Sequence, residues 1–339
     1  MIEKEREFVQ ELRSLIDRIK IEQKHNENMF MCPKHINNHM GFIMYLYGGA
    51  AFTFELCDER WILADYFGHD YCKYFTSEKR GEEIRKEIKH IDKNPEKLVE
   101  LDEEFWDEIC NAFHMWVLQE NVSVGKRRKR DYERMRQTRI CRQNAKNDTF
   151  TIFDMEEKIS LSPSDAPEVD MIAIRHDEKV DVISYIEYKC TDYALSEGKT
   201  KNGKEKPTLA VHYKDMVRYY QDDLIAKRSL ELYKWNQWYE NKQISICDAS
   251  HYRKEIIFLF SNIKWKKGSP ALDPGKEVFV DTIYKRLQKT MQLPDFSKHE
   301  NQVKIIILGD ADTDNVVINS EMILSVEEAN DKFSINIIK

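Results

Sequence analysis

The sequence predicts an α/β protein in which a mixed central sheet is flanked by helices and preceded by a mostly helical N-terminal module. Residues 149–190 hold three runs of apolar residues separated by turn-forming residues, a pattern typical of neighbouring strands. Residues 255–263 form a strongly apolar run that suits a buried strand. Helical segments precede the first strand and separate the third from the fourth. This order favours one sheet covered by helices.

The length of 339 residues exceeds the usual size of a single hydrophobic core, so we expect two parts. Residues 1–122 should form the mostly helical module, whose role the sequence does not indicate. Residues 123–339 should form the α/β domain. Its core is expected over about 125–265, and an α/β extension should follow over 266–339.

The N-terminal module has three segments with helical spacing of apolar residues, at 3–23, 78–90 and 102–119. Between them lie two aromatic-rich runs, Phe42–Tyr47 and Ala51–Leu56. Each run suits either a strand or a buried helix, because a short apolar run has no decisive period. The sequence therefore leaves the middle of the module open.

Composition excludes several classes of protein. The formal net charge of −7 argues against a uniformly basic nucleic-acid binder, although a local basic patch remains compatible with it. No glycine-rich phosphate loop of the GxGxxG or GxxxxGK[ST] type occurs. The seven cysteines include no CxxC pair, which suits free thiols in a reducing compartment. With no long apolar run and no signal-peptide pattern, we expect a cytoplasmic protein.

The N-terminal module contains several cysteine and histidine residues that invite comparison with zinc sites. Their spacing begins as CxxHxxxH, which is not a common zinc-finger pattern, and no CxxC pair anchors it. Isolated buried cysteines and surface histidines explain the residues more simply, so zinc binding is the less favoured interpretation. The residues are Cys32, His35, His39, Cys57, His69 and Cys72.

The centre of the α/β domain is a predicted antiparallel hairpin with Asp170 on its first strand and Glu187 and Lys189 on its second. Side chains two residues apart share a face, so Glu187 and Lys189 point the same way. An even-numbered turn centred between Glu178 and Lys179 places Asp170 directly opposite Glu187. Two carboxylates this close repel each other unless a cation lies between them. The hairpin therefore predicts a metal site.

This pattern resembles the PD-(D/E)XK nuclease superfamily, which has the restriction-endonuclease-like fold. The resemblance rests on Asp170, followed by the residues MIAI, and on Glu187-Tyr188-Lys189 at the end of the next strand. It also rests on the order helix, three strands, helix and strand, and it covers less than half of the chain. One departure is the proline: Pro167 lies three residues before Asp170 instead of next to it.

The resemblance implies a nuclease that uses Mg²⁺, or Mn²⁺, to hydrolyse phosphodiester bonds. Asp170, Glu187 and the carbonyl of Tyr188 would hold the ion. Lys189 would orient the attacking water or hold the phosphate. The expected substrate is nucleic acid, DNA rather than RNA, cut as by an endonuclease, with a role in defence against foreign nucleic acid and a homodimer as further expectations. The alternative is a catalytically inactive scaffold that binds nucleic acid or protein through the same fold.

Three further polar residues are candidates for the same site. Glu133 lies on the helix before the first core strand, where the resembling family sometimes offers an additional acid. Glu157 lies near the end of that strand. Gln221 lies on the helix after the hairpin, where related nucleases often place a glutamine or lysine. For each of them, an ordinary surface position is the simpler alternative.

A basic segment precedes the first core strand. Residues 126–146 carry ten lysines and arginines against two acids. Such a run is either a solvated helix face or a patch that follows phosphates and releases counterions from nucleic acid. The candidate nucleic-acid-binding residues are Lys126, Arg127, Arg128, Lys129, Arg130 and Arg134.

Two predicted elements flank the hairpin. Alternation over residues 149–161 sets Ile152 and Asp154 on one face of the first core strand and Thr151 and Met155 on the other. The helix after the hairpin is expected to run on to about residue 239. Its predicted buried stripe consists of Leu209, Tyr213, Met216, Val217, Tyr220 and Leu224.

Overall fold

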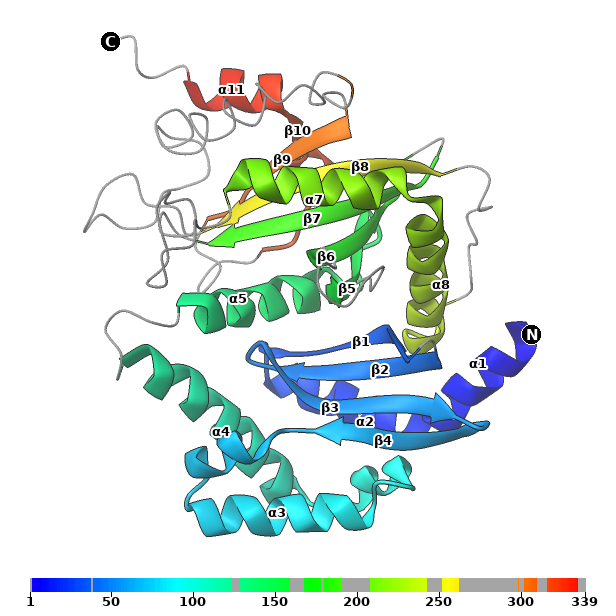
Figure 1. Ribbon diagram of the computed structural model, residues 1–339, viewed down its shortest axis with the longest axis vertical. Coiled ribbons are helices and arrows are strands. Elements are labelled where there is room, and N and C mark those ends of the chain that lie inside the picture. The colour runs from blue at the N-terminus through cyan, green and yellow to red at the C-terminus, as the bar shows by residue number, and fades with distance from the viewer. Residues whose placement is uncertain are drawn as a thin grey trace. The chain divides into compact units, whose positions relative to one another are not determined.

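A computed structural model of the protein describes residues 2–37, 39–122, 129–158, 168–177, 180–190, 208–242, 252–261, 298, 302–309 and 316–334. The chain forms two compact units (Figure 1). Met1–Arg142 and Glu231–Ser245 make up the first unit, and Gln143–Leu230 and Ile246–Lys339 make up the second. The first unit therefore extends twenty residues beyond the predicted boundary at 122 and takes in a later segment.

The first unit is built on a four-stranded antiparallel sheet, so the prediction of a mostly helical module is wrong in its centre. The strands follow one another in sequence order, β1-β2-β3-β4 (Figure 1). They are β1 (Met29–Ile36), β2 (His39–Leu46), β3 (Gly49–Cys57) and β4 (Arg60–Tyr66), accompanied by α1 (Ile2–Glu11), α2 (Arg13–His25), η1 (His69–Tyr74), α3 (Glu78–His90), η2 (Pro95–Glu100) and α4 (Glu103–Val122).

The two runs that the sequence left open are strands β2 and β3. Phe42 and Met44 on β2, and Phe52 and Phe54 on β3, are fully buried, and each pair is two residues apart. In a strand this spacing puts both members of each pair on one face, where they reach the core. Phe52 packs edge-on against Trp106 with ring centroids 6.0 Å apart. Packing against other elements therefore makes these two runs strands, which the local period of apolar residues could not establish.

The second half of helix α8 (Asp223–Tyr239), from Glu231 on, belongs to the first unit, and basic side chains of α2 bind its end. Arg13 donates hydrogen bonds to the carbonyl oxygens of Trp238, at 2.7 Å, and Tyr239, at 3.1 Å. Lys20 Nζ donates to the Tyr239 carbonyl at 2.6 Å. The final carbonyls of a helix have no partner within the helix, and positive charge is favourable there. Trp235, Trp238 and Tyr239 are buried.

The second unit is built on a six-stranded mixed sheet with the order β10-β9-β8-β7-β6-β5. Strands β5, β6 and β7 are antiparallel, β8 and β9 continue parallel to β7, and β10 closes the edge antiparallel to β9. Helix α7 lies against β7 and β8 (Figure 1). The strands are β5 (Phe150–Lys158), β6 (Glu168–Arg175), β7 (Val182–Cys190), β8 (Arg253–Ser261), β9 (Val303–Ile307) and β10 (Leu324–Ser325), and the helices are α7 (Leu209–Gln221), η5 (Ser320–Met322) and α11 (Val326–Ser334).

These elements confirm a mixed α/β fold with a central mixed sheet and flanking helices. Helix α5 (Lys129–Asn144) precedes the first strand of the sheet, as predicted.

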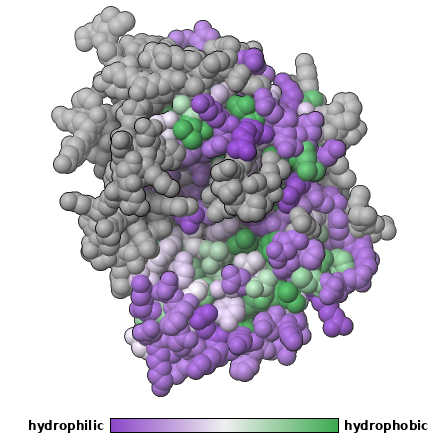
Figure 2. All heavy atoms as spheres, in the orientation of Figure 1, coloured by the Kyte–Doolittle hydropathy of each residue, from purple (hydrophilic) through white to green (hydrophobic). Residues whose placement is uncertain are grey.

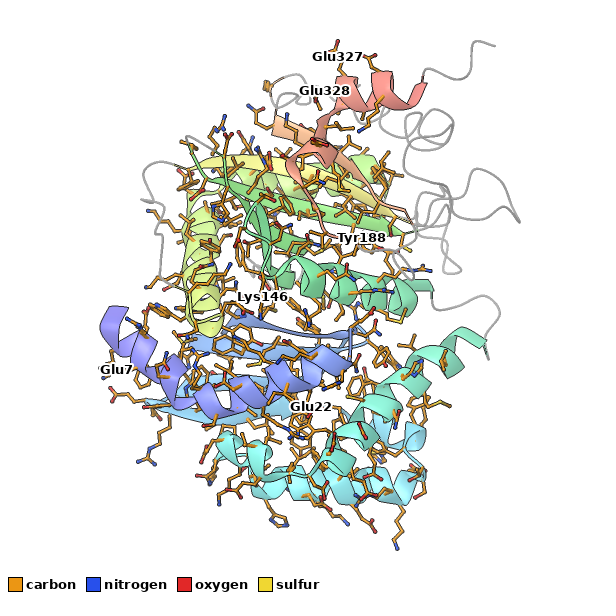
Figure 3. All side chains as sticks on the ribbon, turned by 180° about the vertical axis from the view of Figure 1, so that it is seen from behind. Glu7, Glu22, Lys146, Tyr188, Glu327 and Glu328 are labelled. Atoms are coloured by element: carbon orange, nitrogen blue, oxygen red, sulfur yellow. The ribbon has the colours of Figure 1, made fainter. Side chains whose placement is uncertain are left out.

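The short helix α11 starts with a capping box. Ser325 Oγ accepts from the Glu328 amide, and the Ser325 amide donates to the Glu328 carboxylate (Glu328 is labelled in Figure 3).

The hairpin of β6 and β7 has the register that the sequence predicts. Arg175 pairs with Val182 and Met171 pairs with Ile186, so the turn between the strands has an even number of residues. One step further along the same register, Asp170 lies opposite Glu187. All nine residues of β7 are buried, in keeping with its position between β6 and β8.

The first core strand departs from the predicted alternation because it contains a β-bulge. Ile152 pairs with Ala173, whereas Asp154 pairs with Ile172, so the register shifts between them. A bulge adds one residue to one strand and reverses the faces beyond it. Asp154 therefore lies on the face of Ile172 and Asp170, opposite to Ile152, and it is fully buried.

The predicted long helix after the hairpin is two helices. Asp222 between α7 and α8 has an extended backbone, with φ −89° and ψ 114°. Its Oδ1 accepts from the amides of Leu224, at 2.8 Å, and Ile225, at 3.3 Å, which is the role of an N-cap. The break turns the buried stripe, so Leu224 is 59% exposed and Tyr219 is buried in place of Tyr220.

Substitution Asp222→Ala is expected to lower the free energy of unfolding by about 1 kcal/mol, because it removes the oxygen that caps α8. Urea denaturation followed by circular dichroism measures this change. Asp223→Ala is the comparison variant, since it removes the next acid of the first turn and its ion pair with Lys254 but leaves the capping oxygen in place. An unchanged midpoint for Asp222→Ala would contradict the capping role.

One face of the molecule is shown in Figure 2, coloured by hydropathy. The face in Figure 2 is mostly hydrophilic where it is coloured, with small apolar spots. Single exposed apolar residues of this kind are ordinary on soluble surfaces. Among the described helices, none combines the length and apolar character needed to cross a bilayer. The exposed large apolar residues are Ile21, Met115, Leu118, Val211, Leu224 and Val317.

Behind the hairpin, on the face opposite to Asp170 and Glu187, lies a buried charged network. Arg175 Nε and Nη2 donate to the two carboxylate oxygens of Glu255 on β8, at 3.0 and 2.7 Å. Ser184 Oγ donates to the same carboxylate at 2.6 Å. The Glu255 side chain is 3% exposed, and its hydrogen bonds raise the pKa of Arg175. Three neighbouring strands are thus joined by side chains as well as by the backbone.

Candidate active site

The side chains of Asp170, Glu187 and Lys189 lie together at one end of the hairpin. Lys189 Nζ forms a close ion pair with Glu187 Oε1 and lies 3.9 Å from Asp170 Oδ2. The amide of Tyr188 donates to Asp170 Oδ2 at 2.8 Å, so the backbone of β7 also fixes the first carboxylate (Tyr188 is labelled in Figure 3). An ammonium group thus lies against carboxylates from two adjacent strands.

The three side chains differ in the fraction that is exposed to solvent. The Glu187 side chain is 3% exposed and that of Lys189 is 11% exposed, whereas Asp170 is 26% exposed. Burial would raise the pKa of the Glu187 carboxyl, but Lys189 and His212 outweigh it and lower that pKa below the ordinary value. Glu187 is therefore a buried carboxylate that stays ionised, and water reaches the site from the side of Asp170.

Helix α7 contributes a fourth group, which sequence reasoning did not assign to the site. His212 Nδ1 lies 2.8 Å from Glu187 Oε1, and the imidazole is partly exposed. Asp215, one turn further along α7, has its pKa raised by burial, with Glu187 adding to the rise and His212 opposing it. The site therefore contains a Lys–Glu–His cluster whose parts come from β7 and α7.

The oxygen donors suit a hard divalent ion. Carboxylates and carbonyls are the ligands that Mg²⁺ and Mn²⁺ prefer, and Asp170, Glu187 and the Tyr188 carbonyl are of this kind. The position of the Lys189 ammonium beside both carboxylates indicates that the space between them accepts a positive charge. An ion bound there would compete with Lys189 and His212 for Glu187.

Comparison with known proteins identifies no similar protein. No family model matches the chain, and neither the curated proteins nor the solved structures contain a match. Any functional assignment therefore rests on the site itself.

The additional candidates fare differently from the central three. Glu133 lies half-buried on α5, in the first unit, whereas the site lies in the second. Glu157 pairs with Val169 in the sheet, and its side chain lies outside the described residues. Gln221 is exposed at the end of α7, nine residues after His212. At 1.5 Å and 100° per residue it is about 13 Å along the helix and on its opposite side, so it does not join the site.

The predicted basic patch is only partly within the described chain. Lys126, Arg127 and Arg128 lie outside it, and only the helical backbone of Lys129 and Arg130 is described. Arg134 is half-buried on α5. Nucleic-acid binding by this segment stays a prediction.

Sequence reasoning misses two polar residues near the site. Simple alternation assigns Asp154 to the wrong face, because no residue type in the strand marks its bulge. It is fully buried, and its Oδ1 accepts from the Met155 amide at 2.7 Å. His212 could have been suspected from the sequence, because it lies in the first turns of the helix that follows β7. That end of the helix is close in the chain to the end of β7 that bears Glu187. The sequence does not show how the helix is oriented on the sheet, and this orientation decides whether His212 reaches Glu187.

The lowered pKa of Glu187 predicts a specific pH dependence of stability. A carboxyl whose pKa is lower in the folded state stabilises that state above its unfolded pKa, near 4.3, and loses this contribution as the pH falls through the folded pKa. Glu187→Gln mimics the protonated form. We expect the stability difference between wild type and Glu187→Gln to be largest near neutral pH and to shrink below about pH 4.3.

Denaturant midpoints of both proteins between neutral and acidic pH test this expectation. The comparison cancels the titration of the other carboxyl groups, which both proteins share. A difference that does not change with pH would contradict the ionised state of Glu187 in the fold.

Proposed function

We propose that this protein is a Mg²⁺- or Mn²⁺-dependent nuclease that hydrolyses phosphodiester bonds of nucleic acid, with DNA the favoured substrate. The observation that carries the proposal is the convergence of Asp170, Glu187 and Lys189, two acids and an amine from adjacent strands, with Asp170 partly exposed to solvent. Isolated surface ion pairs do not usually bury a carboxylate as deeply as Glu187. Perturbed ionisable groups of this kind are typical of functional sites.

Each residue has a role in the proposed reaction. Asp170, Glu187 and the Tyr188 carbonyl hold the ion, which when bound neutralises phosphate charge and acidifies a water molecule. Lys189 is positioned to hold a phosphate oxygen or to orient the attacking water. His212 holds Glu187 in place from the side of α7, at 2.8 Å. Such electrostatic groups act most strongly where water is largely excluded.

The strand arrangement also supports the proposal. The antiparallel strands β5, β6 and β7 are followed by α7 and α8 and by the parallel strand β8. This is the order on which the resemblance to the restriction-endonuclease-like fold rests. A homodimer, a cytoplasmic location and a role against foreign nucleic acid are further parts of the proposal, and they come from the resemblance alone.

One observation favours the alternative of an inactive binding scaffold. Glu187 Oε1 contacts both Lys189 and His212, so its charge is balanced by protein groups. A cluster that is satisfied in this way can persist as a structural remnant of a nuclease site. The fold would then serve to bind nucleic acid or protein without cutting.

A cleavage assay separates the two functions. Supercoiled plasmid, single-stranded DNA and RNA are incubated with the full chain, with and without Mg²⁺ or Mn²⁺. A nuclease cuts at least one substrate only when the ion is present, and Asp170→Asn abolishes the cutting. Asp181→Asn is the matched control, because Asp181 lies at the other end of the same hairpin and pairs with His176.

Equal cleavage by wild type and Asp170→Asn would assign the activity to a contaminant and end the proposal. Binding without cleavage, with affinity that falls steeply as salt rises, would establish the scaffold instead.

A further inference from the structure

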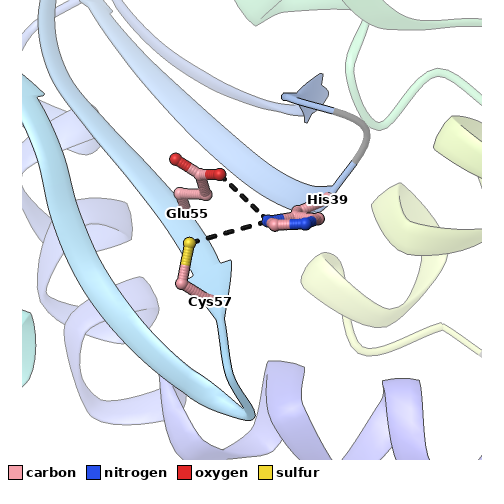
Figure 4. Close-up of side chains that lie close together, drawn as sticks. All are labelled: His39, Glu55 and Cys57. Atoms are coloured by element: carbon pink, nitrogen blue, oxygen red, sulfur yellow. Dashed lines mark hydrogen bonds and ion pairs between the residues drawn. The ribbon is translucent and has the colours of Figure 1, made fainter.

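A second cluster of chemically active side chains lies in the first unit, apart from the proposed nuclease residues. His39 begins β2, and Glu55 and Cys57 lie near the end of β3 (Figure 4). Gly41 pairs with Glu55, and His39 and Cys57 lie two residues beyond this pair on their strands. Side chains two apart share a face, so all three side chains point to the same side of the sheet.

The three donor atoms converge closely. His39 Nδ1 lies 3.1 Å from Glu55 Oε1 and 3.6 Å from Cys57 Sγ, and all three ligand atoms lie within 4.8 Å of one another. Around a tetrahedral zinc ion, with Zn–N and Zn–O near 2.0–2.1 Å and Zn–S near 2.3 Å, neighbouring ligand atoms are about 3.3–3.6 Å apart. The two separations from His39 Nδ1 are close to the edges of such a tetrahedron.

The contacts differ from those of a catalytic cysteine. A histidine that activates a nucleophile contacts it through one ring nitrogen and is oriented by an acid through the other. In this cluster Glu55 and Cys57 both approach Nδ1 of His39 (Figure 4). Three donors directed at one region suit a shared cation better than a proton relay.

The surroundings support a metal ligand role for Glu55. Its side chain is 6% exposed, and Asn37 Nδ2 lies 3.3 Å from each of its carboxylate oxygens. Hydrogen bonds from outside the ligand set commonly fix the orientation of a ligating carboxylate. The His39 side chain is 50% exposed, so solvent reaches the cluster and can supply a fourth ligand.

We propose that His39, Glu55 and Cys57 form a site for a zinc-class divalent ion, with water in the fourth position. A nitrogen, a sulfur and a single carboxylate favour Zn²⁺ over the hard ions Mg²⁺ and Ca²⁺. The proposal is independent of the nuclease assignment. It revises the interpretation of the module's cysteines and histidines, because the structure joins residues from two strands through a glutamate that their spacing does not reveal.

A related cluster in the same unit is a weaker candidate and provides a control. His69 Nδ1 lies 2.9 Å from Glu82 Oε1, and Cys72 completes the group. Arg85 lies 3.8 Å from the same Glu82 oxygen, so a cationic side chain already occupies the neighbourhood that an ion would need. Among the described residues, these two clusters are the ones in which three His, Cys, Asp or Glu side chains bring their ligand atoms within 4.8 Å of one another.

The test uses Co²⁺ as a spectroscopic probe and Zn²⁺ in competition with a coloured chelator. The full chain, freed of metal by dialysis, is expected to bind one Co²⁺ at the cluster and to show thiolate-to-cobalt charge-transfer absorption. Cys57→Ser should abolish this absorption, whereas Cys72→Ser should retain it. His39→Ala and Glu55→Gln should each weaken Zn²⁺ binding by at least about 100-fold, since even loss of an outer hydrogen bond costs about 10–100-fold.

Asn37→Ala supplies the graded comparison, with an expected loss of about 10–100-fold in Zn²⁺ affinity. Glu187→Gln should leave the cobalt absorption unchanged, which separates this site from the proposed nuclease centre. Absence of charge-transfer absorption in the wild type would overturn the proposal. So would absorption that survives in Cys57→Ser, or that disappears only in Cys72→Ser. Circular dichroism of each variant establishes that it is folded.

Discussion

Lys189→Ala is expected to reduce metal-dependent cleavage by about 10²–10³-fold, the usual loss on removing one electrostatic contact to a transition state. Lys189 is the cationic side chain whose nitrogen the structure places beside both Asp170 and Glu187. Without it, the phosphate loses a donor, and Glu187 loses an ion pair while keeping its contact with His212. Initial rates at saturating Mg²⁺ measure the effect.

Loss of activity in Lys189→Ala could also follow from unfolding, because the substitution leaves a buried carboxylate with less compensation. Lys189→Arg addresses this point. It retains the charge but replaces a compact ammonium with a planar fork, so the fold should be kept while activity still falls. Lys254→Ala, which breaks the pair of Lys254 with the exposed Asp223, is expected to cut at the wild-type rate. Full activity in folded Lys189→Ala would remove this lysine from the mechanism.

Arg175→Ala is expected to destabilise the protein by about 3–5 kcal/mol, because it leaves the Glu255 carboxylate buried without its charged partner. Ser184 remains as a donor to that carboxylate, but a hydroxyl supplies no charge. The loss should appear as a lower midpoint in urea denaturation. We expect it to exceed the effect of any exposed ion pair in the same unit.

Arg253→Ala provides the matched comparison for Arg175→Ala. Arg253 pairs with Asp177 close to the same hairpin, but its side chain is 60% exposed. Exposed pairs contribute about 0–1 kcal/mol, so the two arginines should differ clearly. The double variant Arg175→Met/Glu255→Leu should recover much of the stability, since apolar replacement of a buried pair is often neutral or favourable. Similar losses for both arginines would refute the importance of burial.

The hairpin could be predicted from the sequence because two independent constraints agree there. The apolar pattern of β6 and β7 and the even turn both require Asp170 to face Glu187, and the register confirms it. The parity of a strand is a strong constraint, since a slip of one residue would turn every side chain over. Strand β8 also lies where the sequence predicts it, because an apolar run bounded by polar residues has few alternatives.

The parts that sequence reasoning misses depend on contacts between elements. The bulge before Asp154 reverses faces without any glycine to mark it. His212 reaches Glu187 only because of the way α7 lies on β7 and β8, which helical periodicity does not contain. In the first unit, β2 and β3 are strands because neighbouring elements bury one of their faces. Asp222 ends α7 by capping the next helix, although the apolar residues on either side of it keep helical spacing in the sequence.

The hydrogen bonds from Arg13 and Lys20 to the end of α8 limit the order in which the protein can fold on the ribosome. The first unit cannot be completed when residue 142 has been synthesised, because Trp235, Trp238 and Tyr239 follow nearly a hundred residues later. Its final packing must wait until the first part of the second unit, residues 143–230, has also been translated. For the same reason, a truncated chain that ends at residue 142 would lack these three aromatic side chains. It should aggregate through the apolar surface that they cover in the intact chain.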